Sequence, residues 1–176
     1  MQLSSSSPRT TMEVFKMLPE GTLAELIQGT LFMSPAPSLN HQRVVRDLTI
    51  ALGIFVRNSQ LGEIFLAPCD VFLDEHSNAV QPDIIYVSAA KDSIKKKDAI
   101  HGTPDLLIEI LSPSNPEHDL LRKKDLYQHF GVKEYWIIDP QSNETFGFTL
   151  QQGKYHSWGQ YKNKICSVLL NEDFEF

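Results

Sequence analysis

The chain has 176 residues, of which 41% are hydrophobic and 22% charged, and its formal net charge at pH 7 is −6. This length fits one domain with a substantial core, and the composition is that of an ordinary soluble globular protein. The acidic balance argues against a basic nucleic-acid coat protein, but it is compatible with a nuclease, because acids that bind a divalent cation are neutralised by it. No stretch is long and apolar enough to span a bilayer, and the N-terminus lacks the apolar segment of a secretory signal, so we expect a cytoplasmic protein.

Residues 1–12 are rich in Ser and Thr and are expected to form a flexible tail, followed by a single domain over 13–176. Two cysteines, Cys69 and Cys166, are too few for a disulfide framework, and they form no Cys-x-x-Cys pair that would suggest zinc. We therefore expect both to be small core residues.

The first elements predicted along the chain are a hairpin and a helix. Residues 23–27 and 30–34 flank Gln28-Gly29, a pair that favours a tight turn. Ser38 or Asn40 can cap a helix over about 41–57, whose apolar residues recur at helical spacing. His41 shares the inward stripe of that helix.

Strand-like runs follow at about 63–74, 83–87 and 104–111, with prolines at their ends. The lysines at 95–97 are expected in a solvated loop, with phosphate contact as the weaker alternative.

The second half of the chain continues the alternation of helix and strand. A second helix is predicted over about 117–130, ended by Gly131, and a buried strand over 134–139. Antiparallel segments are expected at 144–150, 154–158 and 165–170. The fold class is mixed, α/β or α+β, with β extensions at both ends.

The run at 106–111 is apolar except for one carboxylate, Glu109. A branched aliphatic run this short is typical of a strand buried on both faces of a sheet. Burying an ionised carboxylate is costly unless a cation or hydrogen-bond donors meet it. Two companions lie nearby in sequence: Asp83, before the apolar run 84–87, and Lys123, on the helix that follows.

The second helix is predicted to turn Lys123 inward. At 100° per residue its apolar side chains form one stripe, made by Leu120, Leu126, Tyr127 and Phe130. Lys123 and Asp119 fall within this stripe, whereas Arg122 lies on the opposite side. Taken alone, the inward position of Lys123 is explained by snorkelling of its side chain past apolar neighbours, or by an i,i+4 ion pair with Asp119. Beside a buried Glu109, a functional role becomes the better interpretation.

Two carboxylates and a lysine are the parts of a metal-dependent phosphodiesterase site. Asp83 and Glu109, with the main-chain carbonyl of Ile110, would bind Mg²⁺, for which Mn²⁺ can substitute. Lys123 would orient the attacking water or stabilise the negative charge that develops in the transition state.

Each of these residues also has a structural explanation. Asp83 after Pro82 can simply begin a strand, and Glu109 with Lys123 can form a buried ion pair. By default His41 is a capping or core residue and Glu25, on an outer hairpin, a surface residue. The sequence does not decide whether Asp70 faces the core or solvent, because both faces of its predicted strand contain apolar residues.

Several segments together resemble a known family. They are AELIQGTLFMSPAPSLNH at 24–41, PDIIYV at 82–87, PDLLIEILSPSN at 104–115, a helix with Asp119, Lys123 and Tyr127 at four-residue steps, and GVKEYWIIDP at 131–140. In order and spacing they resemble the Uma-two family of restriction-endonuclease-like proteins, within the PD-(D/E)XK nuclease superfamily. The resemblance covers about residues 13–170.

The resemblance implies a mixed central sheet flanked by helices and a divalent-metal site at Asp83 and Glu109. The superfamily lysine is missing two residues after Glu109, where Leu111 stands, and Lys123 is its natural replacement. Glu25 and His41 are implied as further site residues.

The expected activity is that of a Mg²⁺-dependent DNA endonuclease, in which Asp70, Asp119 and Tyr127 are additional site candidates. A homodimer is compatible with this activity, because two such sites can act on the two strands of a DNA duplex. Two alternatives stay open: an inactive module that binds nucleic acid or a protein, and a hydrolase of small phosphorylated molecules.

Overall fold

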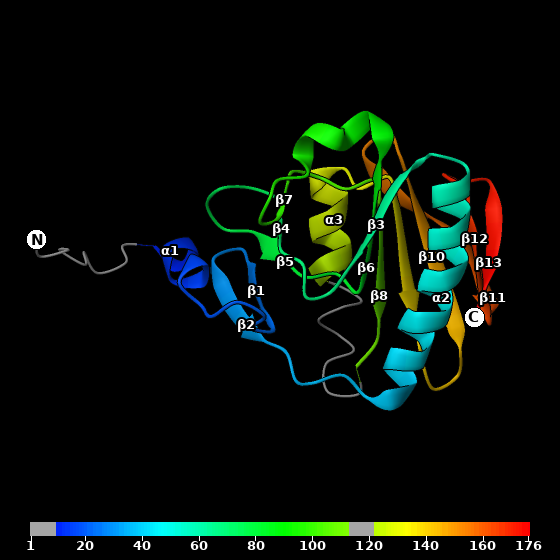
Figure 1. Cartoon of the computed structure of the whole chain (residues 1–176), viewed down its shortest axis with the longest axis horizontal. Helices are drawn as coiled ribbons and strands as arrows, with labels where there is room; N and C mark the ends of the chain where they lie inside the picture. The colour runs from blue at the N-terminus through cyan, green and yellow to red at the C-terminus, as the bar shows by residue number, and fades with distance from the viewer. Residues whose placement is uncertain (1–9, 113–121) are drawn as a thin grey trace, which may run out of the picture.

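A computed structural model describes residues 10–112 and 122–176, and its centre is a six-stranded mixed sheet (Figure 1). In spatial order the strands are β11 (Lys154–Lys162), β10 (Glu144–Gln151), β9 (Glu134–Ile138), β8 (Leu106–Ile110), β6 (Ile84–Ser88) and β3 (Gly62–Leu66). Only the β8–β9 pair of this sheet is parallel. Parallel neighbours need a crossover connection, and the chain between them includes the helix α3 (Lys124–Phe130).

A second sheet of five short strands lies beside the first. Its order is β2 (Thr30–Met33), β1 (Ala24–Ile27), β5 (Ala79–Val80), β4 (Val71–Phe72) and β7 (Ile100–His101). The β1–β2 hairpin turns at Gln28 and Gly29, both with positive φ, as the Gln-Gly pattern predicts. The helix α1 (Thr11–Lys16) packs against this hairpin.

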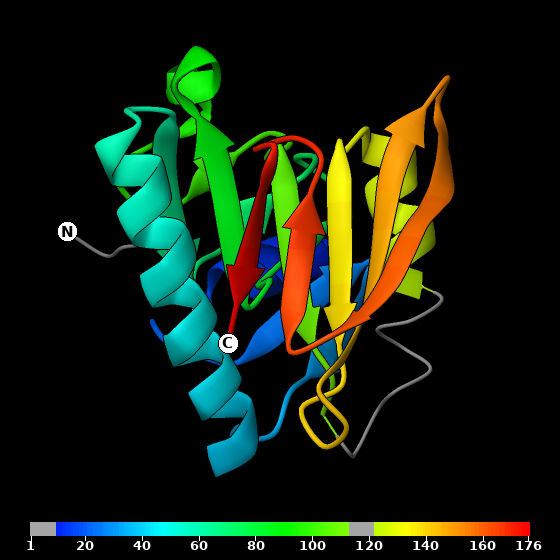
Figure 2. The same cartoon turned by 90° about the vertical axis from the view of Figure 1, so that its right-hand side faces the viewer.

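Both faces of the six-stranded sheet are covered. The helix α2 (Leu39–Asn58) and the hairpin of β12 (Lys164–Ser167) and β13 (Glu172–Glu175) cover one face, as Figure 2 shows. α3 and the smaller sheet pack on the other face. Side chains of β8 therefore alternate between two cores, Ile108 and Ile110 in the first and Leu107 in the second. This explains why β8 reads as a continuous apolar run.

The predicted mixed fold class is confirmed, with differences in the short strands. The expected strand at 63–74 is two strands, β3 and β4, and Pro68, which cannot donate to a ladder, lies in the break between them. The strands β5, β7 and β13 were not predicted, because two to four residues are too few to display a period of two. None of the helices in the described part of the chain is long and apolar enough to cross a membrane.

The N-terminal boundary also differs from the prediction. α1 begins at Thr11, so the last two residues assigned to the tail are helical, and Met12 is buried. The helix starts there because Thr10 and Glu13 form a reciprocal capping box. The remaining tail residues, 1–9, lie outside the described residues. Cys69 and Cys166 are free thiols and half-buried, and each packs against one of the two cores, so they lie at the edge of the core and not in its interior.

Gly147 on β10 offers a test of this packing. A Cβ added at Gly147 would lie 2.5 Å from the indole ring of Trp136, which is fully buried. We expect Gly147→Ala to lower the free energy of unfolding by about 1–3 kcal/mol, because neither the ring nor the strand can move without strain. The matched control is Gly53→Ala in α2, where a Cβ meets nothing within 4 Å. That change should be neutral or stabilising in urea denaturation, since alanine favours the helix.

Candidate functional site

A pocket of about 420 Å³ opens where the β1–β2 hairpin meets the six-stranded sheet. Its walls come from the hairpin, the first turn of α2, the start of β6, the end of β8 and the residue before α3. Five residues that the sequence singled out line it: Glu25, His41, Asp83, Glu109 and Lys123. Ile110, whose carbonyl was the expected third ligand, lines it as well.

Lys123 joins two carboxylates inside the pocket. Its Nζ lies 2.9 Å from Glu25 Oε1 and 2.9 Å from Glu109 Oε1. All three residues are buried, with exposed fractions of 3–4%. The hydroxyl of Tyr127 donates to Glu109 Oε1 at 2.6 Å. Complete burial and the carboxylates of Glu109 and Glu25 hold the pKa of Tyr127 well above its ordinary value, so it stays a donor.

Asp83 is fixed through both of its oxygens. Oδ2 accepts the backbone N–H of Ile110 at 2.7 Å, and Oδ1 lies 3.2 Å from His41 Nε2. Among the described residues, the buried Nδ1 of His41 has no hydrogen-bond partner. Nε2 is therefore the ring nitrogen of His41 that contacts Asp83. Each Asp83 oxygen retains a lone pair for a cation.

Local structure explains why these side chains meet. The Ser38 side chain caps α2 by accepting the N–H of His41, which sets His41 in the first turn on the same face as Val44 and Leu48. On β8, Glu109 alternates with Ile108 and Ile110 and so faces α3. The prediction that Lys123 points inward and Arg122 outward is confirmed, since Lys123 is buried and Arg122 exposed, whereas Leu120 of the same stripe lies outside the described residues.

Other expectations have different outcomes. The default assignment of Glu25 to the surface is wrong, because its position on β1 faces Lys123. Asp70 does not line this pocket but the neighbouring one, and is connected through Gln81, whose Nε2 donates to Asp70 Oδ1 and whose N–H donates to Glu25 Oε1. Asp119 lies outside the described residues. Gln81 was missed, since nothing in the sequence distinguishes it from a surface glutamine.

The charge of the pocket suits a divalent cation. Three carboxylates, on Glu25, Asp83 and Glu109, face one ammonium, which leaves two formal negative charges. Carboxylate and carbonyl oxygens are the ligands of Mg²⁺. No group of three or more His, Cys, Asp or Glu side chains spaced for a metal occurs within 10–112 and 122–176. The expected ligand set needs only two such side chains and a main-chain carbonyl, so the residues present fit a hard cation.

Comparisons with known proteins agree with this fold. A family model described as "Putative restriction endonuclease" (Uma2) matches residues 12–164. The crystal structure of "a putative nuclease belonging to DUF820" from Anabaena variabilis ATCC 29413 has a TM-score of 0.70 and 22% sequence identity. The similarity covers 85% of this chain and 84% of that chain. Among curated proteins no significant match was found.

The mixed sheet flanked by helices, with acidic residues and a lysine at one pocket, defines a protein of the restriction-endonuclease-like fold. The family model spans nearly the whole described chain. The chain belongs to the Uma2 family.

Proposed function

We propose that this protein is a Mg²⁺-dependent endonuclease that hydrolyses phosphodiester bonds of DNA. One observation supports this most directly: Asp83 just before β6, Glu109 on β8 and Lys123 just before α3 line one open pocket. Membership of a nuclease family supports the same activity.

In this proposal each residue has a defined task. Asp83, Glu109 and the Ile110 carbonyl hold Mg²⁺, which when bound polarises a phosphoryl oxygen and lowers the pKa of a water ligand. Lys123 Nζ orients the attacking water or meets the charge that develops on the phosphate. Tyr127 and Glu25 hold Glu109 and Lys123 in place through their 2.6 and 2.9 Å contacts.

The alternative of an inactive module treats Glu109 and Lys123 as a structural ion pair. That pair is present at 2.9 Å. It does not account for Asp83, whose side chain is 16% exposed at the pocket, accepts the N–H of Ile110 and lies 3.2 Å from His41 Nε2. A carboxylate held in this orientation at an open pocket is well placed to bind a cation.

The proposal is tested by cleavage of supercoiled plasmid and of single-stranded circular DNA. We expect cleavage of DNA with Mg²⁺ or Mn²⁺, loss of it with excess EDTA, and recovery when Mg²⁺ is restored in excess. Failure to cut either DNA with either cation contradicts the proposal. Release of phosphate from nucleotides without DNA cleavage would instead identify a hydrolase of small phosphorylated molecules.

His41 is expected to act on the cation through Asp83. His41→Ala removes the ring nitrogen that lies 3.2 Å from Asp83 and should weaken Mn²⁺ binding about 10- to 100-fold, as is typical for partners of metal ligands. His41→Gln can place an amide nitrogen near the position of Nε2 and should recover part of the affinity. Isothermal titration calorimetry with Mn²⁺ measures both. Equal affinities for Ala, Gln and wild type would exclude this role.

A further inference from the structure

Part of the pocket lining is apolar, and we call this part the apolar wall. It is formed by Leu23, Phe32, Met33, Pro35, Pro37 and Pro68. A phosphodiester and its cation need charges and donors, and they make no use of such a wall. Apolar and aromatic walls with a few convergent polar groups are typical of sites that enclose a small organic group.

Phe32 joins this wall to the charged residues. In the β1–β2 hairpin it lies directly opposite Glu25, so both side chains lie on the same face, and Glu25 contacts Lys123. The guanidinium carbon of Arg122 lies 5.3 Å from the centre of the Phe32 ring. An aromatic ring and a guanidinium plane are the two protein groups on which unpaired bases stack.

The charges that line the pocket disfavour binding of duplex DNA through its phosphates. Duplex binding draws much of its affinity from several Lys and Arg side chains that neutralise phosphates. Among the described residues that line the pocket, Lys123 is the one Lys or Arg, and it already contacts two carboxylates. The chain as a whole has a net charge of −6. Stacking of a base on an aromatic ring is a source of binding energy that needs no further cation.

We propose that the pocket receives one unstacked nucleotide, and that the preferred substrate is single-stranded DNA. The base lies on the wall that contains Phe32, while its phosphate reaches Asp83 and Glu109. A base in an intact duplex is paired and stacked, and placing it in the pocket would require flipping it out at a cost. This inference rests on the proposed nuclease function and specifies its substrate class.

The test compares kcat/KM with Mg²⁺ for a labelled single-stranded oligonucleotide and for the same strand in a blunt duplex. We expect the single strand to be cut roughly 5- to 150-fold more efficiently, the range that stacking of one base provides. Phe32→Leu should lower kcat/KM for the single strand by a similar factor, mainly through KM. Phe32→Tyr keeps a stacking ring and should retain most of the wild-type value. Circular dichroism and thermal unfolding check that both variants fold.

The two proposals fail in different ways. Equal or faster cleavage of the duplex, or wild-type kinetics for Phe32→Leu on the single strand, overturns the substrate inference and leaves the nuclease function standing. Preference for RNA of the same sequence also overturns it. Absence of metal-dependent cleavage of every DNA form overturns the proposed function itself.

Discussion

Glu109→Gln is expected to reduce metal-dependent DNA cleavage by about 10³-fold or more while leaving the protein folded. The change removes the charge of one proposed ligand, and with it much of the stabilisation of the transition state. The amide oxygen of glutamine can still accept from Lys123 and Tyr127, which lie 2.9 and 2.6 Å from Oε1. The glutamine amide can therefore replace the hydrogen bonds that Glu109 makes within the fold, but it cannot replace the negative charge that binds the cation. Single-turnover cleavage and thermal unfolding measure the two effects separately.

A second buried glutamate provides the matched control. Glu134 lies on β9, next to β8, and is 1% exposed, but it is not part of the pocket. It accepts the indole N–H of Trp136 and the N–H of Leu169. Glu134→Gln leaves one of these donors less well satisfied and should cost about 1–3 kcal/mol of stability. Cleavage should stay within a few-fold of wild type, and an equal loss of cleavage in both variants would contradict a specific role for Glu109.

The sequence predicted the elements that carry the pocket, because each has a strong local signal. The apolar run around Glu109, the stripe that turns Lys123 inward and the cap at Ser38 are all present in the structure. Such patterns state which face of an element is buried. The convergence of Asp83 on Glu109 follows from the pairing of β6 with β8, where Ile84 lies opposite Ile108.

Features that depend on contacts distant in sequence were not predictable in this way. Glu25 lies on a short strand, and its burial depends on Lys123 and Gln81, which are more than 50 residues away in sequence. Gln81 contributes through a side-chain amide and a backbone N–H, and neither leaves a periodic pattern. The apolar wall of the pocket combines residues of the hairpin with three prolines from later segments, Pro35, Pro37 and Pro68. Hydrophobic periodicity describes one element at a time and carries no information on such pairings.

Lys123→Met is expected to be the most destabilising of the substitutions considered. It leaves Glu25 and Glu109 buried without the ammonium that now lies 2.9 Å from each. Removing one partner of a buried ion pair costs roughly 3–5 kcal/mol. For a chain of this length, that corresponds to a decrease in Tm on the order of 10 °C. DNA cleavage should fall as well, since the charge that faces the phosphate is lost.

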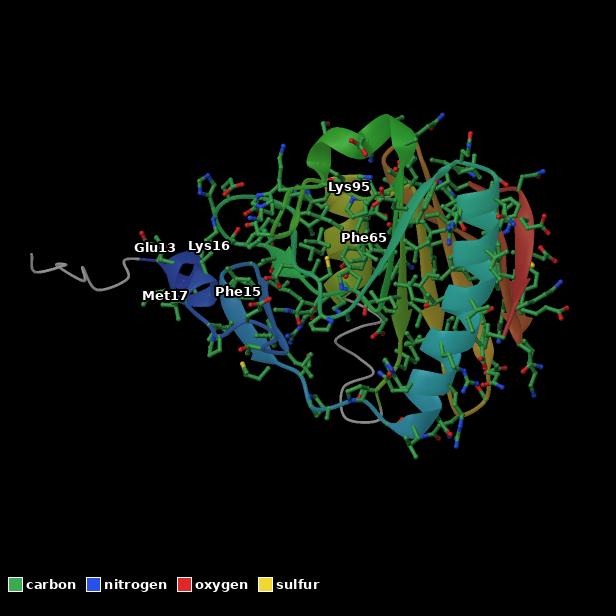
Figure 3. The ribbon with its side chains drawn as sticks, viewed as in Figure 1. Glu13, Phe15, Lys16, Met17, Phe65 and Lys95 are labelled. Atoms are coloured by element: carbon green, nitrogen blue, oxygen red, sulfur yellow. The ribbon has the colours of Figure 1, made fainter. Side chains whose placement is uncertain are left out.

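Lys95 is a matched control, because it also bridges two carboxylates. Its Nζ lies 2.7 Å from Glu63 and 2.6 Å from Asp92, but these side chains are 56% and 77% exposed. Lys95 lies in the upper part of the view in Figure 3, whereas the first turn of α2, which borders the pocket, is at the bottom. Since exposed pairs contribute little, Lys95→Met should cost less than about 1 kcal/mol. Differential scanning calorimetry should separate the two variants clearly.

A double variant shows whether charge or packing causes the loss. If unpaired carboxylates destabilise Lys123→Met, then adding Glu25→Gln should restore part of the Tm, because one buried charge is removed. If the lysine stem contributes mainly by packing, the second substitution should lower the Tm further. Recovery of Tm without recovery of cleavage would separate the two roles of Lys123, as a counter-charge in the fold and as the cation that acts on the phosphate.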